Sequence, residues 1–321
     1  MTNTLTPRNA VRRFAGNPVL TASDVPYECT RVYNSAAVKT DDGYVMVLRI
    51  DVIKPPERPY LFLGLARSAD GIHWTVSKKP LLLPEGAEER AIYDPRVTRI
   101  GDDYVICYAA DTSVGIRLGV AVTRDFEHVE RKHLSAPDNR NAVLFPEKIN
   151  GLYCRLDRPF ARIYEQTRPY DLWLSYSPDL EFWGRHELVL RWQDVTWGSH
   201  KIGPAAPPLR TPAGWLTLFH GAELRTPGPD GWAKTYRAGV MLLDLKNPAR
   251  ILGRCPDPIL EPEDAFSYEN EGYRPKVIFP TGLIDMGDGT CRIYYGASDT
   301  VMAMATARID DLIALCRKNT L

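Results

Sequence analysis

Residues 101–108 read Gly-Asp-Asp-Tyr-Val-Ile-Cys-Tyr, and this polar turn followed by an apolar run is the pattern that decides the fold class. Gly and Asp tolerate the backbone conformations of a tight hairpin turn, and the aromatic and β-branched residues after them favour a strand. The pattern recurs at residues 41–49, 150–158, 213–220 and 288–296. Copies spaced by roughly 50–75 residues predict a radial repeat of small sheets, so we expect an all-β fold, a five-bladed β-propeller.

A second element alternates with these turns. It reads Ser-Ala-Asp-Gly-Ile-His-Trp at residues 68–74 and Ser-Pro-Asp-Leu-Glu-Phe-Trp at residues 177–183, with a shorter copy at 123–126. We expect these segments to form the outer turns of the same unit. Only residues 309–318 have a helical pattern, which predicts a short C-terminal helix. No linker interrupts the repeat, so residues 1–321 are predicted to form one domain, with an irregular pair of β-sandwiches as the alternative architecture.

Composition and charge restrict the classes of function. The 321 residues include 40 Lys and Arg against 40 Asp and Glu. This neutral balance argues against a nucleic-acid partner, which requires a basic surplus. No stretch approaches the roughly 18 consecutive apolar residues that span a bilayer, and the polar N-terminus contains no apolar signal core. We therefore expect a cytoplasmic protein with no membrane partner. The six scattered cysteines form no C-x-x-C pair, which predicts reduced thiols and no metal site.

Polar residues that close apolar runs are the candidates for a central site, because the innermost strands of a propeller surround a pocket. Arg49, Asp94, Arg158, His220 and Asp299 occupy such positions. For any one of them, a strand end that reaches solvent is the simpler interpretation. Taken together, one carboxylic acid facing several cations suits attack by an anion better than attack by water.

Short motifs along nearly the whole chain resemble glycoside hydrolase family 130. In chain order they are Asn-Ser-Ala-Ala-Val at 34–38, Tyr-Asp-Pro-Arg-Val-Thr at 93–98, Asp-Asn-Arg-Asn at 138–141, Leu-Phe-Pro-Glu-Lys at 144–148, Asp-Arg-Pro at 157–159, Lys-Ile-Gly-Pro at 201–204, Phe-His-Gly at 219–221, Tyr-Arg-Ala-Gly at 236–239 and Gly-Ala-Ser-Asp at 296–299. Each motif is weak alone, and the ordered set is specific. The family consists of five-bladed propellers, mostly β-mannoside phosphorylases with some β-mannosidases.

The resemblance implies inverting phosphorolysis of a terminal β-mannoside, with α-mannose 1-phosphate as one product. Inorganic phosphate would be the co-substrate, with no cofactor, and a β-1,4-linked mannobiose or mannooligosaccharide would be the mannoside. Asp94 would be the acid that protonates the glycosidic oxygen through the 3-hydroxyl of mannose. The residues that would bind phosphate are Arg140, Asn141, Arg158, Lys201, His220 and Tyr236. The residues that would contact the non-reducing mannose are Asn34, Ser35, Arg49 and Asp299.

Other functions remain open from the sequence. A β-mannosidase on the same fold would need a carboxylate base, for which Glu147, Glu269 and Glu271 are the candidates. A β-1,2-mannobiose phosphorylase would differ in its loops, of which residues 223–234 are expected to be an exposed example. A non-catalytic sugar-binding propeller would leave the coexistence of Asp94 with the cationic residues unexplained. Homo-oligomers are compatible with each of these functions.

Overall fold

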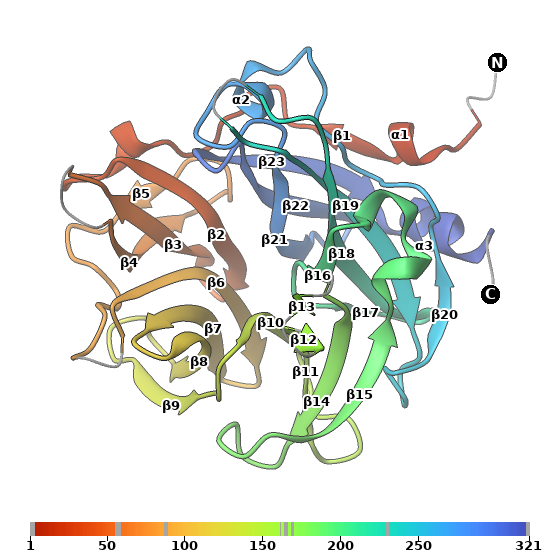
Figure 1. The fold of residues 1–321 in the computed structure, drawn as a ribbon, viewed down its shortest axis with the longest axis horizontal. Helices are drawn as coiled ribbons and strands as arrows, with labels where there is room; N and C mark the ends of the chain where they lie inside the picture. Colours follow the sequence, from red (N-terminus) through yellow and green to blue (C-terminus); the bar gives the residue numbers. More distant parts are fainter. Residues whose placement is uncertain are drawn as a thin grey trace.

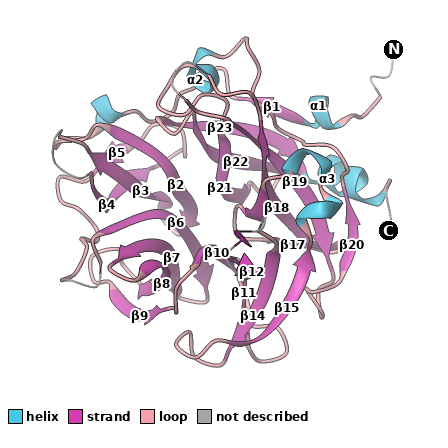
Figure 2. Cartoon of the chain, in the orientation of Figure 1, coloured by secondary structure: helices cyan, strands magenta, loops and turns pink. Residues whose placement is uncertain are grey.

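Five antiparallel sheets surround a central axis in the computed structural model, which describes residues 4–54, 59–86, 89–160, 162–163, 166–167, 170–228 and 231–318 (Figure 1). The predicted five-bladed propeller is therefore confirmed. In blades 1, 2, 3 and 5 the predicted hairpin turn, such as the one between residues 100 and 103, joins the innermost strand to the second strand, and in blade 4 it joins the short strand β17 to β18. Figure 2 shows strands in every blade and helical segments at the periphery of the ring.

The strand nearest the axis comes first in each blade. Blade 1 contains β2 (Arg31–Thr40), β3 (Gly43–Val52), β4 (Tyr60–Ser68) and β5 (Thr75–Val76). Blade 2 contains β6 (Ala91–Ile100), β7 (Asp103–Thr112), β8 (Gly115–Thr123) and β9 (Glu130–Leu134). Blade 3 contains β10 (Asn139–Leu144), β11 (Tyr153–Pro159), β14 (Leu172–Ser177) and β15 (Gly184–Leu190), and β12 (Arg162–Ile163) pairs with β13 (Gln166–Thr167) between β11 and β14. Blade 4 contains β16 (Lys201–Pro204), β17 (Leu209–Thr211), β18 (Gly214–Leu224), β19 (Lys234–Leu243) and β20 (Ile251–Arg254). Blade 5 contains β21 (Ile278–Asp285), β22 (Thr290–Ala297), β23 (Val301–Arg308) and β1 (Val11–Arg13).

The two ends of the chain meet in blade 5, where β1 pairs with β23. Val11 lies opposite Ala307 in this antiparallel pair. Helix α3 (Ile309–Arg317) follows β23 directly and packs on blade 4 at β19 and β20, which confirms the predicted C-terminal helix. Helices α1 (Pro7–Ala10) and α2 (Ser267–Asn270) have four residues each and are too short to show a helical repeat in the sequence. No helix of the described part is long and apolar enough to cross a membrane.

Apolar side chains fill the spaces between neighbouring blades. Between blades 3 and 4, the buried ring of Phe145 meets Trp215 edge to face, with 5.2 Å between the ring centroids. Trp197 stacks on Phe219 in the same cluster, at 5.4 Å. These tryptophans pack between blades, as expected from their size.

The outer turns are held by a repeated hydrogen-bond pattern. In blade 1, Oδ1 of Asp70 accepts the backbone N–H groups of Ile72 and His73 at 2.8 and 2.9 Å. Asp125 and Asp179 accept equivalent N–H groups in blades 2 and 3. This arrangement confirms that the second recurring sequence element forms outer turns, which connect the third and fourth strands of a blade.

Candidate active site

A cavity of about 940 Å³ opens at the centre of the ring and is lined by residues of all five blades. Nine of the eleven predicted site residues line it, namely Asn34, Arg49, Asp94, Arg140, Asn141, Arg158, Lys201, Tyr236 and Asp299. The fold therefore brings residues from seven of the short sequence motifs, together with Arg49, to one cavity.

Three of these residues occupy equivalent positions in successive blades. The innermost strands of blades 1, 2 and 3 each contain a bulge, at which the register with the second strand shifts. The residues at the bulges are Asn34, Asp94 and Asn141, with φ angles of 49°, 51° and 61°. Asn and Asp adopt this left-handed conformation more readily than other residues with a side chain, and a bulge re-aims the side chain it carries. The repeat thus supplies one polar cavity residue from each of three blades.

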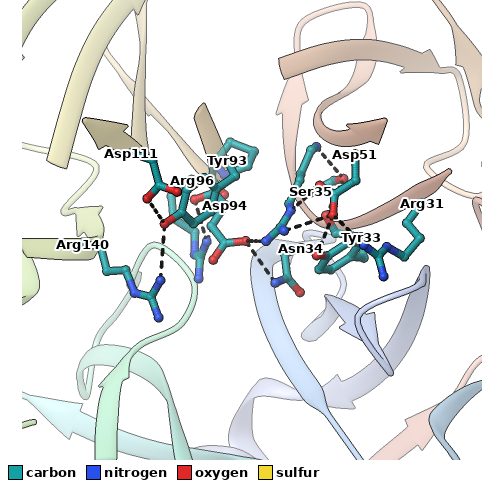
Figure 3. Close-up of polar contacts among 12 residues, drawn as sticks. Arg31, Tyr33, Asn34, Ser35, Asp51, Tyr93, Asp94, Arg96, Asp111 and Arg140 are labelled. Carbon is teal, nitrogen blue, oxygen red and sulfur yellow. Dashed lines mark hydrogen bonds and ion pairs between the residues drawn. The ribbon is translucent and has the colours of Figure 1, made fainter. Parts of the chain in front are cut away.

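Asp94 is held by two donors from blade 1. Nη1 of Arg49 donates to Oδ1 of Asp94 at 2.7 Å. Nδ2 of Asn34 donates to the same oxygen at 3.0 Å (Figure 3). No described side chain bonds to the other oxygen, Oδ2. Arg96 braces the bulge from behind, because its Nη1 donates to the backbone oxygens of Asp94 and Pro95 at 3.1 Å. The carboxylate is therefore fixed in position while one of its oxygens can meet a ligand.

Arg49 is fixed in turn by an acid that the sequence motifs do not include. Its Nε and Nη2 donate to the two carboxylate oxygens of Asp51, at 2.8 and 3.2 Å. Its guanidinium also lies 4.1 Å from the ring centroid of Tyr33. A bidentate ion pair of this kind fixes both the direction and the charge of the arginine.

The two acids predicted for the site differ in protonation. Burial by itself would raise the pKa of Asp94, but the positive charges of Arg49 and Arg96 outweigh it and hold that pKa below its ordinary value. Burial raises the pKa of Asp299 to about 6, and the negative charge of Asp94 adds to this effect. In the unliganded protein at neutral pH, Asp94 is therefore ionised, and Asp299 is close to its titration range.

The wall of the cavity from blades 3 and 4 is cationic. Arg140 on β10 lies opposite Arg158 on β11, and Lys201 begins β16. Buried nitrogens of these arginines, Nε of Arg140 and Nε and Nη2 of Arg158, find no hydrogen-bond partner in the described part of the chain. Neither arginine nor Lys201 forms an ion pair with a described carboxylate. Buried charge without a counter-ion is costly, so this wall is built to receive an anion.

The positive charges of this wall repel one another, and burial together with this repulsion lowers the pKa values of Arg158 and Lys201. Burial and the charge of Arg140 lower the pKa of Arg158 to about 9. Burial and the charge of Arg158 lower the pKa of Lys201 well below its ordinary 10.5. An anion bound between these groups would relieve the repulsion and raise both pKa values.

Two of the predicted site residues lie behind the cavity wall. The Ser35 hydroxyl donates to the backbone oxygen of Tyr33 and accepts the backbone N–H of Arg49, at 3.3 and 3.1 Å. His220 is fully buried, and its Nε2 accepts a hydrogen bond from Nη1 of Arg158 at 3.2 Å. Among the residues described here, Ser35 and His220 therefore support cavity residues instead of lining the cavity, which differs from the expected direct contacts.

Tyr33, Asp51, Tyr93 and Asp111 also line the cavity, although they are not among the predicted site residues. The Tyr33 hydroxyl donates to Asp51 at 2.9 Å, and the Tyr93 hydroxyl donates to Asp111 at 3.0 Å. The hydroxyl of Tyr93 also accepts a long hydrogen bond of 3.5 Å from Nη1 of Arg140 (Figure 3). Both tyrosine–aspartate pairs are separated by 18 residues, and this shared spacing is the signal in the sequence that could have revealed them.

Carboxylates line one part of the cavity only, where the cations Arg49, Arg90 and Arg274 lie beside them. The carboxylates among its described lining residues are Asp51, Glu89, Asp94, Asp111 and Asp299, which come from blades 1, 2 and 5. Blades 3 and 4 contribute no described carboxylate to the lining. The glutamates predicted as bases lie elsewhere: Glu147 pairs with Arg210, buried Glu269 binds Arg13 and Tyr295, and Glu271 is exposed.

The predicted loop at residues 223–234 is shorter than expected. Strands β18 and β19 extend to Leu224 and from Lys234, and both Lys234 and Trp232 line the cavity. The described residues include no group of three or more His, Cys, Asp or Glu side chains that could hold a metal ion. The six cysteines are unpaired, and five of them are buried.

Comparison with known proteins identifies relatives over the whole length of the chain. A family model described as beta-1,4-mannooligosaccharide phosphorylase, that of glycoside hydrolase family 130, matches residues 8–318. A 1,2-beta-oligomannan phosphorylase of Thermoanaerobacter sp. (strain X514) is 33% identical, and the alignment covers 94% of this chain and 98% of that protein. A beta-1,2-mannobiose phosphorylase of Listeria innocua serovar 6a is 37% identical over 78% of this chain and 68% of that protein.

A solved structure has the same fold. The beta-1,2-mannobiose phosphorylase from Listeria innocua in complex with beta-1,2-mannobiose superposes with a TM-score of 0.84 at 28% identity. The match covers 96% of this chain and 99% of the solved chain.

Proposed function

The chain belongs to glycoside hydrolase family 130, and from that membership we propose that it catalyses inverting phosphorolysis of a terminal β-mannoside. The products are α-D-mannose 1-phosphate and a sugar shortened by one mannose. The observation that carries this proposal is the cationic wall, where Arg140, Arg158 and Lys201 are gathered with no counter-ion among the described side chains.

Phosphate binds between blades 3 and 4 in this proposal. The planar forks of Arg140 and Arg158 suit phosphate oxygens, and Lys201 adds a point charge. Asn141, at the bulge of blade 3, and Tyr236, whose ring lies 5.2 Å from Nζ of Lys201, add polar groups on this side, where Lys234 also lines the cavity. His220 acts through Arg158, which it holds from behind.

Asp94 supplies the proton for the leaving group. The glycosidic C1–O bond breaks, a new C1–O bond forms to phosphate on the opposite face of the sugar, and the leaving oxygen takes the proton. An acid must be protonated to do this, whereas cations hold the pKa of Asp94 low in the empty site. A bound phosphate offsets the charge of Arg140 and so raises the pKa of Asp94. Binding of phosphate thereby prepares the acid.

The distribution of carboxylates supports phosphorolysis over hydrolysis. An inverting hydrolase needs a second carboxylate that activates water on the face opposite the leaving group. The side of the cavity opposite blade 1 contributes cations and no described carboxylate. Phosphate is itself an anionic nucleophile and needs no such base.

We place a β-1,2 linkage first and a β-1,4 linkage second. Two relatives at 37% and 33% identity are named for β-1,2-linked substrates. The family model is described by a β-1,4-linked substrate, which keeps the β-1,4 linkage as the second candidate. Asn34, Arg49 and Asp299 are the groups that we expect to contact the non-reducing mannose in either case.

The test is incubation of the purified protein with β-1,2-mannobiose and, separately, β-1,4-mannobiose, each with and without inorganic phosphate. Mannose 1-phosphate formed only in the presence of phosphate, and from the β-1,2-linked sugar, is the expected result. Cleavage of the β-1,4-linked sugar alone would select the second linkage. Equal release of mannose with and without phosphate would identify a hydrolase and contradict the proposal.

A further inference from the structure

A second hollow lies beside the catalytic cavity on blade 1. This hollow, here called the Tyr60 groove, has a volume of about 510 Å³. Its apolar lining consists of Tyr27, Val52, Tyr60, Phe62, Pro80 and Leu83. Tyr60 is 43% exposed and Leu83 is 47% exposed, so two large apolar side chains of the same hollow are open to solvent.

Tyr60 connects the groove to the catalytic cavity, because it lines both. It is the first residue of β4, and Phe62 follows two positions later on the same face of the strand. The ring centroids of Tyr60 and Phe62 are 5.5 Å apart, and those of Phe62 and Tyr27 are 5.9 Å apart. The three rings therefore pack in a series from the rim of the cavity to the groove, in which Phe62 is buried and supports the exposed ring of Tyr60.

The stereochemistry of inversion places the leaving sugar near this rim of the cavity. Inversion requires the nucleophile and the leaving group to lie on opposite faces of the sugar. The cationic wall belongs to blades 3 and 4, and in a ring of five blades the position across the axis from their boundary is blade 1 (Figure 1). On blade 1 the cavity rim is formed by residues 59–61, with Tyr60 at the entrance to the groove.

We propose that the Tyr60 groove binds the sugar units of a β-mannooligosaccharide that lie beyond the unit next to the cleaved bond. This inference rests on the proposed function. The apolar CH faces of sugars can pack on Tyr60 and Leu83, while sugar hydroxyls reach the polar rim. That rim includes an exposed ion pair of 2.6 Å between Glu28 and Lys54. Aromatic side chains with a polar tip are suited to ligands that are apolar on one face and wet on the other. The enzyme is therefore built for chains longer than a disaccharide.

The test measures phosphorolysis as a function of chain length. The wild-type protein and the variants Tyr60→Ala, Tyr60→Phe and Leu83→Ala are compared on di-, tri- and tetrasaccharides of the linkage that the wild type cleaves. We expect the wild-type kcat/KM to rise with chain length. Tyr60→Ala should lower kcat/KM for the tetrasaccharide about tenfold more than for the disaccharide, which corresponds to about 1.4 kcal/mol of binding. Tyr60→Phe keeps the ring and should keep most of the rise, and Leu83→Ala should remove part of it.

Phe182→Ala is the matched control, since Phe182 is an aromatic residue of blade 3 that is 72% exposed and lies away from both hollows. It should leave the dependence on chain length unchanged. Calorimetry in phosphate-free buffer provides a second measurement, in which the wild type should bind the tetrasaccharide more tightly than the disaccharide and Tyr60→Ala should not.

Three outcomes would overturn the inference while leaving the proposed function intact. The first is a wild-type kcat/KM that does not depend on chain length, and the second is the same chain-length profile in Tyr60→Ala and Phe182→Ala. The third is a Leu83→Ala variant whose oligomeric state changes in sedimentation while its kinetics do not. The last outcome would assign the groove to a contact between copies of the chain. Failure of the wild type to cleave any disaccharide in a phosphate-dependent manner would instead contradict the proposed function.

Discussion

The side-chain amide of Asn34 donates to the carboxylate of Asp94 across 3.0 Å, although the two residues are 60 positions apart in the sequence. They meet because each occupies the bulge in the innermost strand of its blade, and the two blades are neighbours. The propeller repeat thus places a neutral donor of one blade against the acid of the next.

Substitution of Gly296 should disturb this contact. A Cβ atom at Gly296 would overlap the side-chain oxygen of Asn34 and lie 2.7 Å from its backbone nitrogen. Gly296→Ala should push Asn34 away from Asp94 and lower kcat by roughly tenfold, with a loss of about 1–3 kcal/mol in the free energy of unfolding. Gly184→Ala is the control, because a Cβ atom there meets nothing within 4 Å. Equal kinetics and melting temperatures in the two variants would show that the contact is not needed.

Replacement of the acid should abolish turnover without unfolding the protein. Asp94→Asn keeps the size of the side chain but removes the proton donor, so we expect kcat to fall by about 10³-fold, within the range of general acid catalysis. Arg49 remains fixed by Asp51 in this variant. Circular dichroism and the rise in melting temperature with phosphate should match the wild type. Activity within tenfold of the wild type would remove Asp94 from the catalytic role.

Phosphate binding should take up protons. Burial and Arg158 hold the pKa of Lys201 well below its ordinary 10.5 in the empty site, and a bound anion raises it. At pH values between the lowered pKa of Lys201 in the empty site and its raised pKa in the phosphate-bound site, phosphate binding is therefore coupled to protonation of Lys201. The KM for phosphate should accordingly increase as the pH rises through this range. Calorimetry in two buffers of different ionisation enthalpy measures the number of protons taken up.

Lys201→Met should reduce this proton uptake and raise the KM for phosphate by roughly 10–100-fold, as expected for loss of a charged hydrogen bond. The control is Lys246→Met, which alters an exposed lysine of blade 4. Proton uptake in Lys201→Met equal to that of the wild type would place the coupling on another group.

Removal of the Tyr93 hydroxyl should weaken the binding of phosphate more than the binding of the mannoside. It links Asp111 to Arg140, through hydrogen bonds of 3.0 and 3.5 Å. Tyr93→Phe and Asp111→Asn should each raise the KM for phosphate about three- to tenfold, and the double variant should show less than the sum of the two effects. Tyr108→Phe removes a comparable buried hydroxyl, which donates to Glu89 on the same side of the fold. An unchanged KM for phosphate in Tyr93→Phe would show that Arg140 does not depend on this bond.

The architecture could be predicted because its signals are local. A Gly- or Asp-containing turn and the alternating run after it are read from fewer than ten residues, and the repeat of five such turns sets the number of blades. The pairing of β1 with β23 could not be predicted in the same way. Three residues, Val11–Arg13, carry too little pattern, and their partner lies at the other end of the chain.

The sequence indicates which residues gather around the site better than it indicates which of them face the cavity. The ordered motifs contain eight of the nine predicted residues that line the cavity, all except Arg49, yet the same motifs include Ser35 and His220, which lie behind it. A motif reports which residues occur together and not which of two neighbours in a strand faces the ligand. The bulges decide that, since they re-aim Asn34 and Asp94 while Ser35 turns to the backbone. Asp51 lies only two positions after Arg49 but belongs to none of the motifs.

The central claim, that phosphate replaces water as the nucleophile, is tested most directly by the stoichiometry of products from mannobiose. We would follow the reaction by ³¹P and ¹H NMR in phosphate buffer. The predicted result is one free mannose and one α-D-mannose 1-phosphate for each bond cleaved, with an equal loss of inorganic phosphate. Two molecules of free mannose for each bond, with inorganic phosphate unchanged, would contradict the account and make the cationic wall something other than the nucleophile site.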